Sequence, residues 1–120
     1  MMQGFIGQNL FPAWTRLVND AIHQQCRMEP DRFLGACQLP QNIHEPDTTH
    51  CLAELRRCVD ELGFVGVYVS PDPEGRRNGP GMAEPYWYPL YAECEERQLP
   101  IVVHGTNCLD PRFAPVPANY

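Results

Sequence analysis

The chain has 120 residues, 43% of them hydrophobic and 20% charged, a composition typical of one globular domain with a single core. Its formal net charge of -6 argues against nucleic acid as a partner, because phosphate binding needs a basic face. All nine basic residues are arginines, so a lysine Schiff base or a lysine general base is excluded within this chain.

The first expected element is a helix from Pro12 to Met28. Pro12 suits the first turn of a helix. Five apolar residues recur at helical spacing and predict a buried stripe. They are Trp14, Leu17, Val18, Ala21 and Ile22. A short apolar run from Arg32 to Cys37 then predicts a strand with a polar exit at Gln38.

A second helix is expected after the loop at residues 41–47, with an N-cap supplied by Asp47, Thr48 or Thr49. Its apolar stripe runs from Leu52 to Leu62, and Gly63 is expected to end it. The apolar run at residues 64–70 predicts the next strand.

A glycine- and proline-rich loop, residues 71–85, follows, and its part from Gly75 to Glu84 is expected to form a mobile loop near the site. Residues 86–98 predict a third helix, and residues 99–104 a strand that ends at His104. The tail from Cys108 to Tyr120 has no regular pattern.

The six cysteines form no CxxC pair, and four of them lie in expected helices, so we expect free buried thiols. No apolar run approaches the roughly 20 residues of a membrane span, and the N-terminus lacks a secretory signal. We therefore expect a cytoplasmic protein with no membrane partner.

The order helix, strand, helix, strand, helix, strand, with continuously apolar strands, predicts an α/β fold with a parallel sheet. Right-handed crossovers then bring Gln38, Ser70 and His104 to the same edge of the sheet. His104 closes a strand expected to be buried on both faces and precedes a polar loop. Its imidazole is a candidate for a metal or substrate role, and a hydrogen bond to a neighbouring backbone group is the alternative.

A three-stranded parallel sheet with two open edges makes a poor independent domain, whereas a (β/α)8 barrel needs about 250 residues. We interpret residues 1–120 as a single partial domain, an internal piece of a (β/α)8 TIM barrel. A complete small sandwich of helices and sheet is the alternative. Open edges also favour association, and a homo-oligomer is compatible with them.

Five motifs in a fixed order resemble the amidohydrolase-related metal-dependent hydrolases and lyases. They are RFLGACQLPQ at 32–41, ELGFVGV at 61–67, SPDP at 70–73, WYPLY at 87–91 and LPIVVH at 99–104. Within that superfamily the combination is most similar to the 4-oxalomesaconate hydratases of the protocatechuate 4,5-cleavage pathway. The resemblance covers nearly all of the chain.

The resemblance implies a barrel with a divalent metal, usually zinc, at its C-terminal mouth, and His104 falls on one of the metal ligands. The remaining ligands belong to positions outside this chain. Ser70 stands where the hydratase pattern has asparagine, and Asn107 and Tyr120 are the other candidates for binding the substrate. Loop-closing hydrogen bonds are the alternative role for all three. Arg112 is either a partner for a substrate carboxylate or a solvated loop residue.

The implied function is that of a lyase of aromatic catabolism that adds water to an unsaturated polycarboxylate, so the expected partner is a small-molecule carboxylate substrate. A decarboxylase or hydrolase of the same superfamily is one alternative, and a catalytically inactive fragment or binding module is another. A specific zinc site needs three or four protein ligands, so we expect the isolated chain to be inactive. The other histidines, at 23, 44 and 50, are expected to be surface or cap residues.

Overall fold

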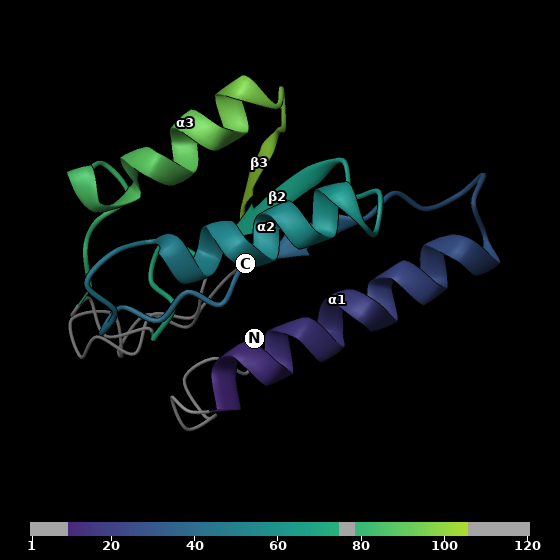
Figure 1. Ribbon diagram of the computed structural model, residues 1–120, viewed down its shortest axis with the longest axis horizontal. Helices are drawn as coiled ribbons and strands as arrows, with labels where there is room; N and C mark the ends of the chain where they lie inside the picture. Colours follow the sequence, from purple (N-terminus) through teal and green to yellow (C-terminus); the bar gives the residue numbers. More distant parts are fainter. Residues whose placement is uncertain (1–9, 75–78, 106–120) are drawn as a thin grey trace, which may run out of the picture.

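The computed structural model describes residues 10–74 and 79–105, in which helices and strands alternate along the chain (Figure 1). The elements in order are α1 (Phe11–Met28), β1 (Ala36–Gln38), α2 (Thr49–Asp60), β2 (Gly66–Val69), a 3-10 turn η3 (Pro85–Trp87), α3 (Tyr88–Glu96) and β3 (Ile101–Val103). The predicted order of elements is therefore confirmed. The third helix differs in detail, since its first turn is 3-10 and the α-helix ends at Glu96.

The three strands form one sheet in the order β1-β2-β3, and both neighbouring pairs are parallel. Cys37, Val67 and Ile101 lie in one row across the sheet. Because all strands run the same way, their C-terminal ends meet at one edge. The predicted α/β class with a parallel sheet is confirmed.

The core lies between the sheet and the helices, and α2 sits between α1 and α3 (Figure 1). The buried residues of this core are Cys37, Leu39, Cys51, Leu55, Cys58, Phe64, Val67, Val69, Trp87, Leu90 and Cys94. All five cysteines in the described residues are free thiols, as expected, but Cys26 is only partly buried whereas the other four are buried. The sixth, Cys108, lies outside the described residues.

The buried face of α1 is not the predicted apolar stripe. None of the five stripe residues is fully buried, and Leu17 is 61% exposed. The helix instead buries Phe11, Thr15 and Asn19, which recur every four residues. The reason is a pair of hydrogen bonds between the Asn19 side chain and the main chain of β1, which fix the rotation of the helix about its axis.

Two expectations about the strands were also wrong. The first strand begins only at Ala36, and Phe33 and Leu34 before it are 48% and 78% exposed. The strand that precedes His104 is not buried on both faces, since Val102 and Val103 are 50% and 54% exposed. The physical reason is that β3 is an edge strand, paired within the described residues to β2 alone.

The predicted start of α2 is confirmed, whereas the α-helix ends at Asp60, two residues before the end of the predicted stripe at Leu62. Thr48 is its N-cap residue, and the preceding Asp47 carboxylate accepts the N–H of Thr49 at 2.8 Å. Gly63 follows the helix with φ of +70°, in the left-handed region that glycine adopts without strain. Among the helices of the described residues, none combines the length and apolar character that a bilayer span needs.

We predict that the chain self-associates through β3, because an edge strand with exposed valines can pair with a second sheet. In sedimentation velocity the unsubstituted chain should exceed the 13.7 kDa of a monomer. Val102→Lys should shift it toward the monomer, because a lysine opposes edge-to-edge pairing. Gln24→Lys, on the exposed side of α1, is the matched control and should leave the distribution unchanged. A monomeric unsubstituted chain would contradict the prediction.

A network of ion pairs joins α2 to α3. Arg56 binds Glu93 with two hydrogen bonds of 3.0 and 2.7 Å, and Arg97 binds Glu93 at 2.7 Å and Asp60 at 2.8 Å. The hydrogen bonds from Arg56, with those from Arg97, lower the pKa of Glu93 to about 2.

This network predicts a stability loss in acid. The folded-state pKa of Glu93 lies below the unfolded value, so its contribution is complete above pH about 4.5 and is lost as the pH falls toward 2. Since Arg56 is largely exposed, we expect a loss of about 1 kcal/mol in the free energy of unfolding. Denaturation across this pH range should show a smaller change for Glu93→Gln. The exposed Glu95→Gln control should follow the unsubstituted chain.

Candidate functional site

The C-terminal edge of the sheet brings Ser70 and His104 next to each other. Val69 pairs with Val103, and the N–H of His104 donates to the Val69 carbonyl at 3.0 Å. Ser70 and His104 follow this pair directly. Side chains alternate along a strand, so both extend to the face of Tyr68 and Val102. This face is opposite to the row of Cys37 and Val67, which packs against the helices.

His104 is a partly buried imidazole with an unpaired nitrogen. Its ring lies beside the ring of Tyr68, with 5.2 Å between centroids. The Nδ1 atom is buried and has no hydrogen-bond partner among the described residues. The alternative role, a backbone hydrogen bond, is therefore not formed at Nδ1. An unpaired buried nitrogen is costly, and a ligand would remove that cost.

Tyr68 is a neighbour of His104 that sequence reasoning missed. Burial raises the pKa of its phenol, so this group is neutral across the physiological range. The sequence signal that could have identified Tyr68 is the alternation of side chains along β2, which places Tyr68 and Ser70 on the same face of the sheet. Using it requires the register between β2 and β3, which the sequence does not encode locally.

Ser70 is 4% exposed, and its main chain is held by a side chain from the loop after β1. Gln41 Nε2 donates to the Ser70 carbonyl at 2.9 Å, and the Ser70 N–H donates to Gln41 Oε1 at 2.7 Å. The Ser70 Oγ atom is buried without a hydrogen-bond partner among the described residues. The hydroxyl therefore does not close the loop, which was its alternative role.

The two other predicted substrate-binding residues, Asn107 and Tyr120, lie outside the described residues, as does Arg112. Residues 75–78 of the loop after β2 also lie outside them. The described part of this loop is tied to η3 and α3, since Trp87 Nε1 donates to the Pro80 carbonyl at 3.1 Å and the Tyr91 hydroxyl donates to the Met82 carbonyl at 2.6 Å.

The described residues fit a single metal ligand and not a complete metal site. They contain no group of three or more histidine, cysteine, aspartate or glutamate side chains that could hold an ion. His23 Nδ1 lies 3.0 Å from the Leu62 carbonyl, and His44 pairs with Glu74 at 3.1 Å. His50 lies in the first turn of α2, with Nε2 3.4 Å from the Cys51 sulfur. His104 is thus the histidine whose position suits a ligand at the sheet edge.

A second carboxamide, that of Asn19 on α1, holds the end of β1. Its Nδ2 donates to the Gln38 carbonyl at 2.9 Å, and its Oδ1 accepts the Gln38 N–H at 2.9 Å. The same Nδ2 donates to Glu54 Oε1 at 2.8 Å. All hydrogen-bonding groups of this fully buried side chain are therefore used.

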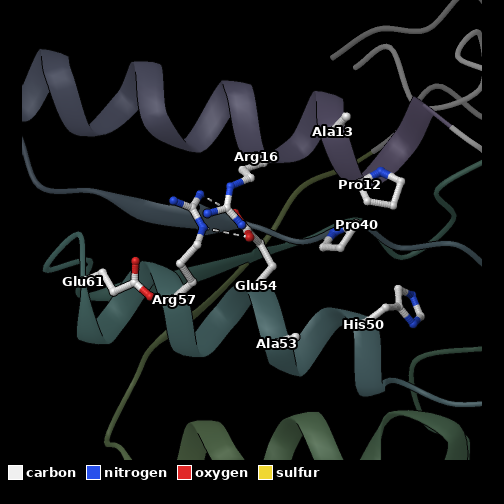
Figure 2. A pocket seen from close by; sticks show the side chains of 9 residues that line it. All are labelled: Pro12, Ala13, Arg16, Pro40, His50, Ala53, Glu54, Arg57 and Glu61. Atoms are coloured by element: carbon white, nitrogen blue, oxygen red, sulfur yellow. Dashed lines mark hydrogen bonds and ion pairs between the residues drawn. The ribbon is translucent and has the colours of Figure 1, made fainter.

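Glu54 and Arg57 form the centre of a pocket of about 560 Å³ between α1 and α2 (Figure 2). Arg57 binds both carboxylate oxygens of Glu54, at 3.0 and 2.7 Å, and reaches Asp20 at 2.8 Å. Burial alone raises the pKa of Glu54, but the hydrogen bonds from Arg57 and Asn19 outweigh it and hold the pKa below its usual range. Glu54 and Arg57 are paired with each other, so neither is a free acid or base in this pocket, and the bond from Arg57 to Asp20 joins α2 to α1.

A family model for amidohydrolases matches residues 4–118, nearly the whole chain. The chain belongs to the amidohydrolase family. It is 35% identical over 114 residues to a 2-keto-4-carboxy-3-hexenedioate hydratase of a Sphingobium species, covering 94% of this chain and 33% of the relative. It is 36% identical over 101 residues to a gamma-resorcylate decarboxylase of Rhodococcus jostii, covering 80% of this chain and 30% of that relative.

Solved structures confirm the predicted fold. The 4-oxalomesaconate hydratase from Rhodopseudomonas palustris superimposes with a TM-score of 0.76 at 33% identity, over 82% of this chain and 30% of that chain. The 2,6-dihydroxybenzoate decarboxylase from Rhizobium gives 0.78 at 27% identity, over 97% and 36%. The three parallel strands are thus an arc of the amidohydrolase barrel, and the chain spans about a third of the length of the curated relatives it matches.

We predict that Asn19→Leu lowers the free energy of unfolding by about 3 kcal/mol. The substitution leaves the Gln38 main-chain groups without their side-chain partner and removes one of the hydrogen bonds to the Glu54 carboxylate. Urea denaturation measures the loss. The matched control is Gln24→Leu on the exposed side of the same helix, which should change the value by less than about 0.5 kcal/mol. Equal effects of the two substitutions would show that the buried carboxamide has no special role.

Proposed function

We propose that residues 1–120 form part of the barrel of a metal-dependent hydro-lyase that adds water to the carbon–carbon double bond of an unsaturated polycarboxylate. The observation that carries this is that His104 Nδ1 and the Ser70 hydroxyl, on residues that follow paired strand positions, are both buried without a hydrogen-bond partner among the described residues, at the sheet edge where α/β barrels hold their active sites. The similarity to a hydratase over 94% of the chain supports this reaction.

His104 would serve as one neutral nitrogen ligand of a divalent metal, and the other ligands would come from further barrel strands. We propose zinc, although a related decarboxylase from a Polaromonas species has a structure with bound manganese. When bound, the metal lowers the pKa of a water molecule or polarises a substrate oxygen. Ser70, Asn107 and Tyr120 would orient carboxylate or carbonyl oxygens of the substrate.

A cytoplasmic location and a small-molecule carboxylate substrate complete the proposal. The five free thiols of the described residues suit a reducing compartment. A role in the protocatechuate 4,5-cleavage pathway of aromatic catabolism fits a substrate of this class. A homo-oligomer remains part of the proposal.

Non-oxidative decarboxylation is the second candidate reaction. It is favoured by the 36% identity to gamma-resorcylate decarboxylase and by the superposition of a dihydroxybenzoate decarboxylase over 97% of the chain. Both reactions use the same barrel edge, so His104 would have the same place in either. The identity of the substrate separates them.

Two chimeric proteins test the reaction. In the hydratase chimera and in the decarboxylase chimera, this chain replaces the matching segment of the relative. In the Sphingobium hydratase, the exchange should retain hydration of 2-keto-4-carboxy-3-hexenedioate. In the Rhodococcus decarboxylase, it should abolish release of carbon dioxide from gamma-resorcylate. The opposite pattern would favour decarboxylation, and the isolated chain should be inactive in both assays.

In the hydratase chimera, His104→Ala should lower both the amount of bound metal and kcat/KM. We expect a loss greater than the roughly 10- to 100-fold typical of residues that only support a metal ligand. His23→Ala is the control, because His23 bonds to the Leu62 carbonyl on the helix side of the molecule. Unchanged metal content in His104→Ala would remove the ligand role from this residue.

A further inference from the structure

Gln41 replaces a missing strand residue beside the end of β2. The ladder between β1 and β2 ends at the pair of Gln38 and Tyr68, after which the first chain turns away. Three residues later the Gln41 side chain returns to Ser70 and bonds to both its N–H and its carbonyl. The carboxamide thus makes the two hydrogen bonds that a neighbouring parallel strand would make. Gln41 is 2% exposed, so water does not compete for these bonds.

These bonds fix the direction of the Ser70 side chain. Main-chain groups of successive strand residues point to opposite sides. Val69 uses its carbonyl toward β3, where it accepts the His104 N–H, and Ser70 uses its groups toward Gln41. Residues 69 and 70 are therefore held from both sides. The Ser70 hydroxyl is left on the face of His104, and its oxygen has no partner among the described residues.

We propose that Gln41 is a positioning residue that presents the Ser70 hydroxyl to an oxygen of the substrate held next to His104. This inference rests on the proposed function. A carboxylate oxygen only accepts hydrogen bonds, and a serine hydroxyl has one proton to donate, so the pair is complementary. Serine is short, and its oxygen can reach a substrate group only if its main chain is held in place. Gln41 supplies that restraint without touching the substrate.

The first test measures the restraint on the full 120-residue chain. Residue-resolved hydrogen–deuterium exchange should show the Ser70 amide exchanging at least tenfold faster in Gln41→Met, while the Tyr68 amide changes by less. Methionine fills the same space without the two hydrogen bonds, so the change isolates them from the packing. The control is Leu90→Ala, a buried residue of α3, which should speed exchange broadly and not at Ser70 in particular. Equal acceleration at Tyr68 and Ser70 in Gln41→Met would overturn the restraint.

The second test measures substrate recognition in the hydratase chimera, in which this chain replaces the matching segment of the Sphingobium hydratase. Gln41→Met should raise KM at least tenfold with bound metal unchanged, and Ser70→Ala should raise it by a similar factor. The double variant should be no worse than either single one, because both remove the same contact. A variant such as Leu90→Ala, which lowers thermal stability as much, should leave KM unaltered. An additive double variant, or an equal KM rise in Leu90→Ala, would reduce Gln41 to a structural role.

The two tests separate the restraint from the proposed function. If the hydratase chimera without further substitutions has no hydratase activity, the proposed reaction fails, and with it the recognition role of Ser70. The exchange rates at Ser70 still decide whether Gln41 holds this residue. If hydratase activity is present and Gln41→Met leaves KM unaltered, the positioning role is wrong and the proposed reaction stands.

Discussion

The structure depends on how the main-chain groups at the ends of its parallel strands are satisfied. A parallel ladder leaves N–H and C=O groups unpaired wherever a neighbouring strand stops or is absent. Two buried carboxamides supply these partners, Asn19 for Gln38 and Gln41 for Ser70. Each donates to a carbonyl and accepts from the N–H of the same residue. The result is a sheet edge whose first two strand ends are held by side chains, while the third, His104, is held by the main chain of β2.

The contact between the Asn19 side chain and the main chain of β1 is linked to α2 through charged side chains. Asn19 also donates to Glu54, and the Glu54 carboxylate is bound at both oxygens by Arg57. Removing one member of such a buried pair leaves an uncompensated charge, which costs more than the pair contributes. The network therefore fixes alignment more than it adds stability. Rotating α1 by about half a turn would bury Leu17 in place of Asn19, but it would leave the Gln38 main-chain groups without their side-chain partner.

The features visible in the sequence are those set by local patterns. Apolar runs and the cap residues near Asp47 predicted the order of elements, the parallel sheet and the start of α2. The buried face of α1 was missed because apolar periodicity gives no weight to a polar residue that is buried with all its hydrogen bonds made. The exposure of Val102 was missed because a valine-rich run is the same on an edge strand as on a central one. The site was partly visible: Ser70 and His104 follow from strand ends, whereas their contacts with Gln41 and Tyr68 depend on register and a returning loop.

The chemistry expected of this family needs more than this arc can hold. One imidazole leaves a metal ion mostly hydrated, whereas a specific site takes three or four protein ligands. In a closed barrel each strand has two neighbours, so the ligands converge from several strands and the sheet has no open edge. The exposed valines of β3 and the single proposed ligand, His104, among the described residues thus have the same cause, because both the covering strand and the other ligands would come from further barrel strands. What this chain can fix by itself is the main-chain position of His104, the proposed ligand, and of Ser70 next to it. These main-chain positions do not depend on a metal or substrate for their hydrogen bonds, because the Gln41 bonds to Ser70 and the Val69 contact to His104 involve only the chain's own atoms.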